Sequence, residues 1–198
     1  FSFNTFYLNS KNNFMGSFFI TIDTEGDNLW SYPNPIETNN LKRLPKFQML
    51  CEKFNFKPIY LTNWECANDE FFVNHFKELQ DEKKCEIGMH LHAWNNPPLH
   101  KKAKTRNRGP FLIEYDIEVM RRKISTITNI LEDKFEKDLV SHRAGRWAIN
   151  SDYLDFLVKL NYKIDCSYTP YINWSNLSPD YKNAGIDYSH IRNVTYKH

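Results

Sequence analysis

The stretch that decides the fold is Phe18-Phe19-Ile20-Thr21-Ile22-Asp23-Thr24-Glu25, an apolar run that ends in two carboxylates. A second stretch, Cys85-Glu86-Ile87-Gly88-Met89-His90-Leu91-His92, follows the same plan but ends in two imidazoles. Short apolar runs bounded by polar residues are typical of strands that are buried on both faces. The two stretches therefore predict two buried strands with ionisable groups at their carboxyl ends.

Strand-like and helix-like segments alternate along the chain, which is typical of an α/β domain. Strands are expected at 17–23, 57–62, 85–92, 139–143 and 163–167, with a further short strand at 191–196. Helices are expected at 41–55, 69–80, 114–135 and 151–160, with N-caps at Asn68 and at Asn150 or Ser151. Residues 1–15 show no clear period and are assigned to an N-terminal extension, which leaves 16–198 as a single domain.

The composition is that of a soluble globular protein, with 41% hydrophobic and 25% charged residues among 198. This length suffices for one α/β domain with a full core. A formal net charge of +2 argues against a nucleic-acid binder that depends on a broad basic face. One basic cluster, Lys101-Lys102-Ala103-Lys104-Thr105-Arg106-Asn107-Arg108, is either a solvated loop or a lid over an anionic or sugar-phosphate substrate.

The four cysteines, Cys51, Cys66, Cys85 and Cys166, form no Cys-x-x-Cys pair. Their spacing supports neither a zinc finger nor a disulfide scaffold, so free thiols in a reducing compartment are expected. No apolar run reaches transmembrane length and no signal-peptide pattern is visible, so no membrane span is expected and a cytoplasmic location is favoured. The chain begins with Phe1 rather than Met, which is consistent with a fragment of a longer protein.

Ionisable residues follow several of the predicted strands, and in parallel α/β folds the functional sites form at the carboxyl ends of strands. Residues i and i+2 of an extended segment point to the same side, so His90 and His92 can face one metal ion. Asp23 and Glu25 have the same relation. One carboxylate with two imidazoles is a hydrolytic metal-binding set that leaves room for water, and a second carboxylate can act as general base.

Two further strand ends contribute candidates. A buried Arg143 near Asp23 would hold that carboxylate as an anion and orient it, although an ordinary ion pair is the alternative. Asp165 is a candidate to hydrogen-bond a catalytic or positioning group, or else a simple turn residue. Aromatic residues make up 16% of the chain, and Trp94 and Trp147 are candidates to stack on a sugar ring, with core packing as the alternative.

The order and content of these motifs resemble the polysaccharide deacetylase family, the carbohydrate esterases that share the NodB homology domain. The resemblance runs from about Phe18 to Pro170. Thr21-Ile22-Asp23-Thr24-Glu25 is similar to the first motif, which implies that Asp23 is the catalytic base and Glu25 a metal ligand. Glu86-Ile87-Gly88-Met89-His90 resembles the lead-in to the second motif, which implies that His90 is a ligand.

The third and fourth motifs have matches as well. Ser141-His142-Arg143-Ala144-Gly145 resembles the third motif, whose arginine orients the base, so the resemblance implies this role for Arg143. Tyr162-Lys163-Ile164-Asp165-Cys166-Ser167 is similar to the fourth motif and matches its aspartate with Asp165. The fold implied is a distorted (β/α) barrel with fewer than eight complete units.

Two positions depart from the family pattern. The usual second motif is His-x-x-x-His, and Trp94 stands where its second histidine is expected, so strand geometry assigns that ligand to His92. A Gly-x-His-x-His variant also resembles a branch of the family associated with bacterial surface-polysaccharide synthesis. The last motif, Leu-x-His, supplies the general acid in the family; His190 matches it poorly, which is consistent with a chain truncated at its C-terminus.

The resemblance implies a metal-dependent hydrolase that removes acetyl groups from an N-acetylated saccharide. Zinc is the expected metal, although cobalt, nickel or manganese fit the same ligands. Three alternatives stay open: a hydrolase of another non-peptide carbon–nitrogen bond, a catalytically inactive saccharide-binding domain of the same fold, and a purely structural metal site. The pattern specifies neither the saccharide nor an oligomeric state.

Overall fold

A six-stranded sheet organises the computed structural model of the chain, which describes residues 2–5, 18–99, 110–175 and 185–194. The basic cluster 101–108 lies outside these ranges. The strands follow one another in the sheet in chain order: β1 (Ser2–Thr5), β2 (Phe18–Thr24), β3 (Ile59–Thr62), β4 (Glu86–Leu91), β5 (Ser141–Ala144) and β6 (Ile164–Asp165). β2 to β6 are parallel to their neighbours, and β1 pairs with β2 in the antiparallel direction.

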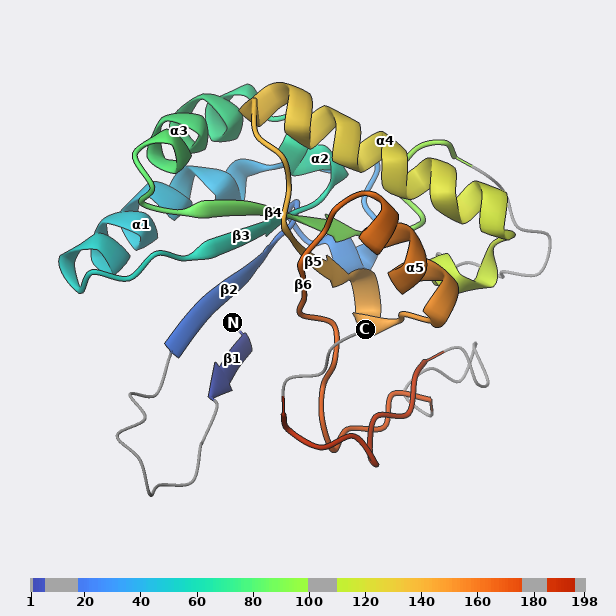
Figure 1. Cartoon of the computed structure of the whole chain (residues 1–198). Helices are drawn as coiled ribbons and strands as arrows, with labels where there is room; N and C mark the ends of the chain where they lie inside the picture. The colour runs from blue at the N-terminus through green and yellow to red at the C-terminus, as the bar shows by residue number, and fades with distance from the viewer. Residues whose placement is uncertain (1, 6–17, 100–109, 176–184, 195–198) are drawn as a thin grey trace, which may run out of the picture.

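Helices connect the parallel strands. The α-helices are α1 (Leu44–Lys53), α2 (Trp64–Ala67), α3 (Glu70–Asp81), α4 (Ile117–Phe135) and α5 (Ser151–Lys159). Short 3₁₀ turns cover Leu29–Ser31, Asn39–Arg43, Leu112–Glu114 and Gly145–Trp147. The five parallel strands curl into a half-barrel with α1, α3 and α4 on its outer side (Figure 1). This confirms the predicted α/β class and the distorted barrel with fewer than eight units.

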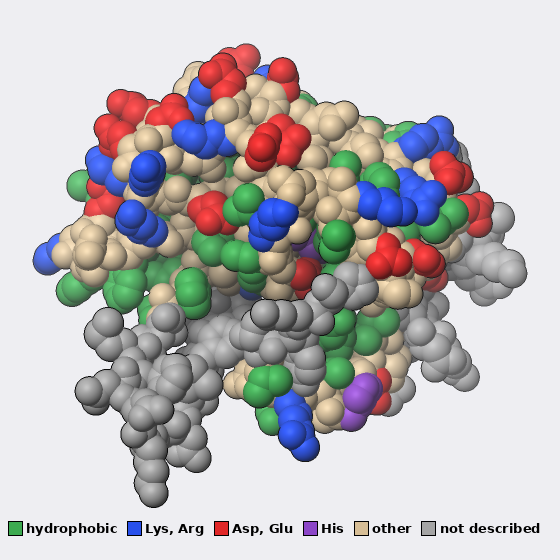
Figure 2. Space-filling model, viewed as in Figure 1, with side chains coloured by type: hydrophobic (Ala, Val, Ile, Leu, Met, Phe, Trp, Pro, Cys, Tyr) green, Lys and Arg blue, Asp and Glu red, His purple; other side chains and the backbone are tan. Residues whose placement is uncertain are grey.

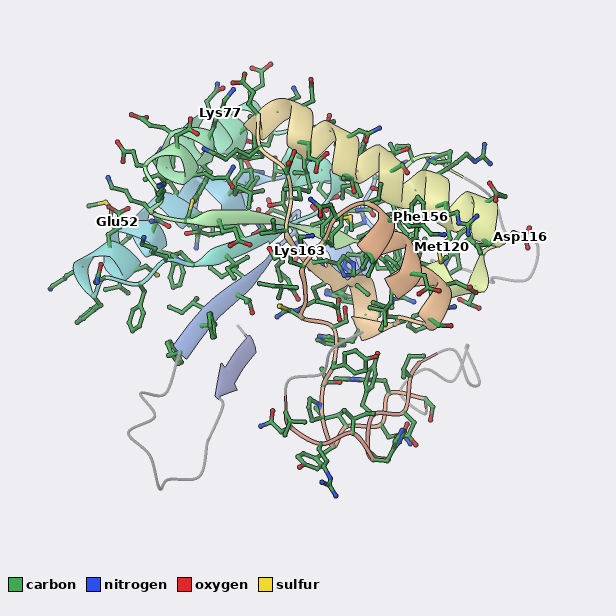
Figure 3. The ribbon with its side chains drawn as sticks, viewed as in Figure 1. Glu52, Lys77, Asp116, Met120, Phe156 and Lys163 are labelled. Carbon is green, nitrogen blue, oxygen red and sulfur yellow. The ribbon has the colours of Figure 1, made fainter. Side chains whose placement is uncertain are left out.

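The core forms because each helix turns one apolar stripe toward the sheet. In the longest helix, α4, the buried positions recur every three or four residues and include Met120, Ile124, Ile127 and Leu131. They pack with the apolar residues of β4 and of α5 in one cluster. Figure 3 shows Met120 on α4 and Phe156 on α5 where these two helices meet.

Local capping sets several helix starts. Asp69, rather than the predicted Asn68, caps α3, because its side chain accepts a hydrogen bond from the Phe72 N–H at 2.8 Å. Asn150 caps α5 by accepting from the Tyr153 N–H at 3.0 Å, as expected. The helix expected at 114–135 begins only at Ile117, because the preceding residues form a separate 3₁₀ turn.

The structure contradicts one of two further expectations and confirms the other. The strand expected at 191–196 is wrong for 191–194, where the structure has no strand; 195–196 are not among the described residues. The four cysteines are free, three of them buried, as predicted.

Figure 2 shows acidic and basic side chains intermixed over the helical face. Within the described ranges, no helix is long and apolar enough to cross a membrane.

Candidate metal centre

The parallel strands bring their polar carboxyl ends to one edge of the sheet. Asp23 in β2 lies opposite Leu61 of β3, and His90 in β4 lies opposite Arg143 of β5. Glu25 follows directly after β2, as His92 follows β4. Residues far apart in the sequence therefore converge, because parallel strands place all of their carboxyl ends together.

Glu25, His90 and His92 form a compact cluster at this edge. Their potential ligand atoms all lie within 4.8 Å of one another. The Nε2 atom of His90 is 3.0 Å from Oε1 of Glu25 and 3.1 Å from Nε2 of His92, and His92 also contacts the same carboxylate oxygen. Both imidazoles are buried, whereas the Glu25 side chain is partly exposed.

The donor set fits a divalent metal ion. The Nδ1 atom of His90 lies 2.8 Å from the backbone carbonyl oxygen of Arg143, a contact in which Nδ1 carries the proton. This tautomer leaves the Nε2 lone pair of His90 facing Glu25, as a metal ligand requires. Two imidazole nitrogens and one carboxylate oxygen suit zinc and leave a coordination position for water. Among the described residues this is the one such cluster of His, Cys, Asp or Glu.

The same cluster shifts the pKa values of its members in opposite directions. Burial alone would raise the pKa of Glu25. The hydrogen bonds with His90 and His92 more than offset this effect and bring the pKa below its ordinary value, so the carboxylate stays ionised. Burial lowers the pKa of His92 to about 4. For His90, the charges of Asp23 and Glu25 outweigh burial and raise the pKa. In the absence of metal, His90 is therefore the imidazole that holds a proton most readily.

Asp23 lies beside this cluster and is oriented by Arg143. The Nη1 atom of Arg143 is 2.5 Å from Oδ1 of Asp23, and the buried guanidinium also donates to Oγ1 of Thr21 at 2.7 Å and to the carbonyl oxygen of Cys166 at 3.0 Å. Three fixed bonds hold the arginine in one position, so its planar fork sets the direction of the Asp23 carboxylate. The sequence-based pairing of Asp23 with Arg143 is thus present in the structure.

Asp165 belongs to a different network. Its Oδ1 accepts from Nδ1 of His142 at 2.7 Å and from Oγ of Ser167 at 2.6 Å, and Nε2 of His142 contacts the hydroxyl of Tyr153 at 2.8 Å. Ser167 in turn accepts from the N–H of Ala144 at 2.8 Å. Asp165 therefore ties β6 to β5, and the described structure shows no hydrogen bond from it to the metal-ligand cluster or to Arg143.

A glycine allows the backbone after β5 to approach His92. A Cβ atom added to Gly145 would lie 2.6 Å from Nδ1 of His92 and 2.3 Å from the carbonyl oxygen of Leu91. Both distances are too short for any real side chain. The next two residues, Arg146 and Trp147, adopt positive φ angles of 57° and 55°, an uncommon conformation for residues other than glycine.

Aromatic rings form a wall beside the cluster. The ring centroid of Trp94 lies 4.3 Å from that of His92, and Trp30 lies 5.5 Å from His92 and 5.9 Å from Trp94. The guanidinium of Arg146 lies 4.4 Å from the Trp94 ring centroid and donates to the hydroxyl of Tyr32. The predicted Trp94 is therefore at the site, and Trp30 joins it as a residue that sequence reasoning did not select.

Trp147 lies in a second aromatic pair. Its ring stacks on that of Trp174, with centroids 4.4 Å apart and an interplanar angle of 12°. Its backbone carbonyl oxygen accepts from the Tyr188 hydroxyl at 2.5 Å. One face of Trp147 is covered by this partner. A role for it in substrate binding therefore remains a prediction.

Glu65 is a partly buried acid that the sequence pattern did not reveal. It lies in the short helix α2, and its carboxylate accepts hydrogen bonds from the N–H of Gly26, from Asn63 and from Asn95. Burial raises the pKa of Glu65, and these hydrogen bonds offset part of that shift. The sequence pattern near Glu65 indicates only that Asn63 can cap a short helix. It does not predict the contacts between Glu65 and distant loops.

No family model matches the sequence, and no curated protein matches it. Solved structures do match. A putative polysaccharide deacetylase from Mycobacterium smegmatis aligns with a TM-score of 0.53 at 14% identity, over 74% of this chain and 49% of that chain. The deacetylase PplD from Streptococcus pyogenes, in complex with acetate, aligns with a TM-score of 0.51 at 13% identity, over 73% and 53%. The chain has the polysaccharide deacetylase fold.

The polysaccharide deacetylase fold also includes proteins without native activity. A mutant of a CE4 family pseudoenzyme from Bacillus anthracis, with restored enzymatic activity, aligns with a TM-score of 0.50 at 12% identity, over 74% of this chain and 43% of that chain. The chain thus spans about half the length of the solved structures it matches. At identities of 12–14% the similarity concerns the fold alone, so evidence for an activity must come from the residues of the site.

Proposed function

We propose that the chain is a metal-dependent hydrolase that removes acetyl groups from an N-acetylated saccharide. The observation that carries this proposal is the convergence of Glu25, His90 and His92 beside the Asp23–Arg143 pair. A three-ligand metal set with a second, oriented carboxylate next to it is an arrangement that can promote amide hydrolysis. The polysaccharide deacetylase fold supports a saccharide as the substrate.

Each residue has a distinct role in the proposed reaction. Glu25, His90 and His92 would hold a zinc ion, which would supply Lewis acidity toward the amide carbonyl and make water more acidic. Asp23 takes the proton from the attacking water, and Arg143 keeps the Asp23 carboxylate directed toward that water. The carbon–nitrogen bond then breaks to release acetate, and the leaving amine takes up the proton. Trp94 and Trp30 offer apolar faces on which a sugar ring can stack.

The experiment is a comparison of acetate release and metal content across single variants. His90→Ala is expected to lose both, whereas Asp23→Asn is expected to keep the metal and lower acetate release by about 10²–10⁴-fold, because it removes the base and not a ligand. His75→Ala on α3 is the control, since its ring contacts Phe71 and Phe76, away from the site. Unchanged metal content and activity in His90→Ala would refute the proposal.

An inactive saccharide-binding domain is the second candidate, and one observation favours it. His190, the poor match to the family's general acid, is exposed beside Asp187, and no described contact joins it to Glu25, His90 or His92. Binding of an acetylated oligosaccharide by the metal-loaded protein without acetate release would establish this candidate. If the protein cleaves small amides or ureides but releases no acetate from acetylated saccharides, it is a hydrolase of another carbon–nitrogen bond.

A further inference from the structure

Glu65 joins three of the loops that surround the metal-ligand cluster. Its Oε1 atom is 3.0 Å from the backbone nitrogen of Gly26, in the loop after β2, and 2.5 Å from Nδ2 of Asn63, after β3. Its Oε2 atom is 2.6 Å from Nδ2 of Asn95, in the loop after β4. One partly buried carboxylate therefore connects the carboxyl ends of three consecutive strands.

The contact to Gly26 bears directly on the ligand Glu25. The N–H of Gly26 and the C=O of Glu25 belong to the same peptide group. Glu65 accepts from the N–H, and Nδ2 of Asn40 donates to the C=O at 2.8 Å. Because this peptide plane is held at both ends, the backbone torsion that aims the Glu25 side chain is fixed.

The loop also has no room to adjust around Glu65. A Cβ atom added to Gly26 would lie 2.4 Å from Cγ2 of Ile36 and 3.0 Å from Cγ of Glu65. The Glu65 side chain thus packs against the backbone that it holds. On its other side, Asn95 directly follows Trp94, so the same carboxylate also anchors the loop that carries the aromatic wall.

We propose that Glu65 is a positioning residue that sets the direction of the metal ligand Glu25 through the Glu25–Gly26 peptide. Partners one step removed from metal ligands orient those ligands, and their loss typically lowers metal affinity by about 10–100-fold. Glu65 does not touch the metal-ligand atoms itself. The inference rests on the metal site of the proposed function.

Two substitutions separate the reach of Glu65 from its charge. Glu65→Asp keeps the negative charge but withdraws the acceptor by one methylene, about 1.5 Å. Glu65→Gln keeps the length and an acceptor oxygen for Gly26 but removes the charge. Oδ1 of Asn95 is buried and has no partner among the described residues, so a rotated Asn95 amide can accept from the new glutamine.

The experiment measures zinc affinity of the folded variants by competition with a chelator. A positioning role predicts a loss of about 10–100-fold in Glu65→Asp and Glu65→Ala, and an affinity close to that of the unmodified chain in Glu65→Gln. Should Glu65→Ala not fold, the Asp and Gln variants decide. Equal affinities in all folded variants, or loss in Glu65→Gln with retention in Glu65→Asp, would overturn the inference, the latter in favour of an electrostatic role.

Glu132→Ala is the matched control. Oε1 of Glu132 accepts from the N–H of Leu139 at 3.0 Å, so it also holds a loop by a backbone contact, but at the amino end of β5. This variant is expected to lose stability and to keep its zinc affinity.

Failure of the proposed function gives a different result. If the unmodified chain binds no zinc, the metal site of the proposed function is wrong, and amide exchange of Gly26 in the metal-free protein still tests Glu65. Fast exchange in Glu65→Asp with slow exchange in Glu65→Gln supports the hold on this peptide, whereas equal rates in both overturn it.

Discussion

The Nδ1 atom of His90 lies 2.8 Å from the backbone carbonyl oxygen of Arg143, whose side chain binds Asp23. One residue of β5 thus orients a candidate metal ligand with its backbone and the candidate base with its guanidinium. The two functions are separable by mutation, because a side-chain substitution leaves the carbonyl oxygen in place. This separation gives the first prediction.

Arg143→Lys is expected to keep its metal and to lose activity. A lysine ammonium cannot reproduce the three bonds to Asp23, Thr21 and Cys166, so the Asp23 carboxylate loses its fixed direction. A misplacement of about 1 Å can lower a rate by about 10²-fold. Metal content by atomic absorption, alongside acetate release, checks this. A parallel loss of metal would show that the side chain also shapes the ligand cluster.

Zinc affinity is expected to fall as the pH falls through the raised pKa of His90. Glu25 is already ionised and the pKa of His92 is about 4, so one proton, on His90, must leave for the metal to bind. Below the pKa of His90 the affinity should fall about tenfold per pH unit, and above it the affinity should be constant. Titrations with zinc from about pH 5 to pH 8 measure this slope. A slope of two protons would mean that His92 is also protonated.

Gly145→Ala is expected to lower zinc affinity by about 10–100-fold, because its methyl group would displace His92 or the end of β4. Gly185→Ala is the control, since its Cβ atom would meet the backbone of Trp174 at 2.3 Å instead of a ligand. Both variants are expected to lose stability in thermal unfolding. Equal zinc affinity in the two variants would contradict a specific effect on His92.

Trp30→Ala is expected to raise KM and leave kcat nearly unchanged. Trp30 is 54% exposed, and its ring lies 5.5 Å from that of His92, so it offers a face to the substrate without touching the base. A contact made equally in the ground and transition states affects KM alone. An aromatic contact of about 0.5–1.5 kcal/mol corresponds to a KM increase of about 2–13-fold. Phe71→Ala, on the surface of α3, is the control, and a fall in kcat alone would argue against stacking.

Much of the site could be predicted because its signals are local. The i, i+2 spacing of His90 and His92 fixes their common direction on an extended segment, and the structure brings both to Glu25. The same alternation places His142 and Arg143 on opposite sides of β5, the first toward Asp165 and the second toward Asp23. Parallel strands then bring these local patterns to one edge.

The remaining features depend on contacts between distant segments, which leave no local pattern. In the sequence, Glu65 looks like any surface acid in the first turn of a short helix. Its contacts with Gly26 and Asn95 are visible only in the folded structure. The stacking of Trp147 on Trp174 likewise depends on how the segment after β6 returns to β5. Two predicted helix starts differ from the structure by a few residues, because Asp69 caps α3 and a 3₁₀ turn precedes α4.

Lys123 of α4 has a consequence for how this protein can vary. Its buried ammonium donates to the carbonyl oxygens of Ala93, Asn96 and Pro98, so the loop that carries Trp94 is bound to the N-terminal half of α4. These three hydrogen bonds hold the helix and the loop together. A changed contact along α4 that shifts the helix is therefore expected to shift the Trp94 ring as well, so residues far from the cluster can alter the shape of the aromatic wall.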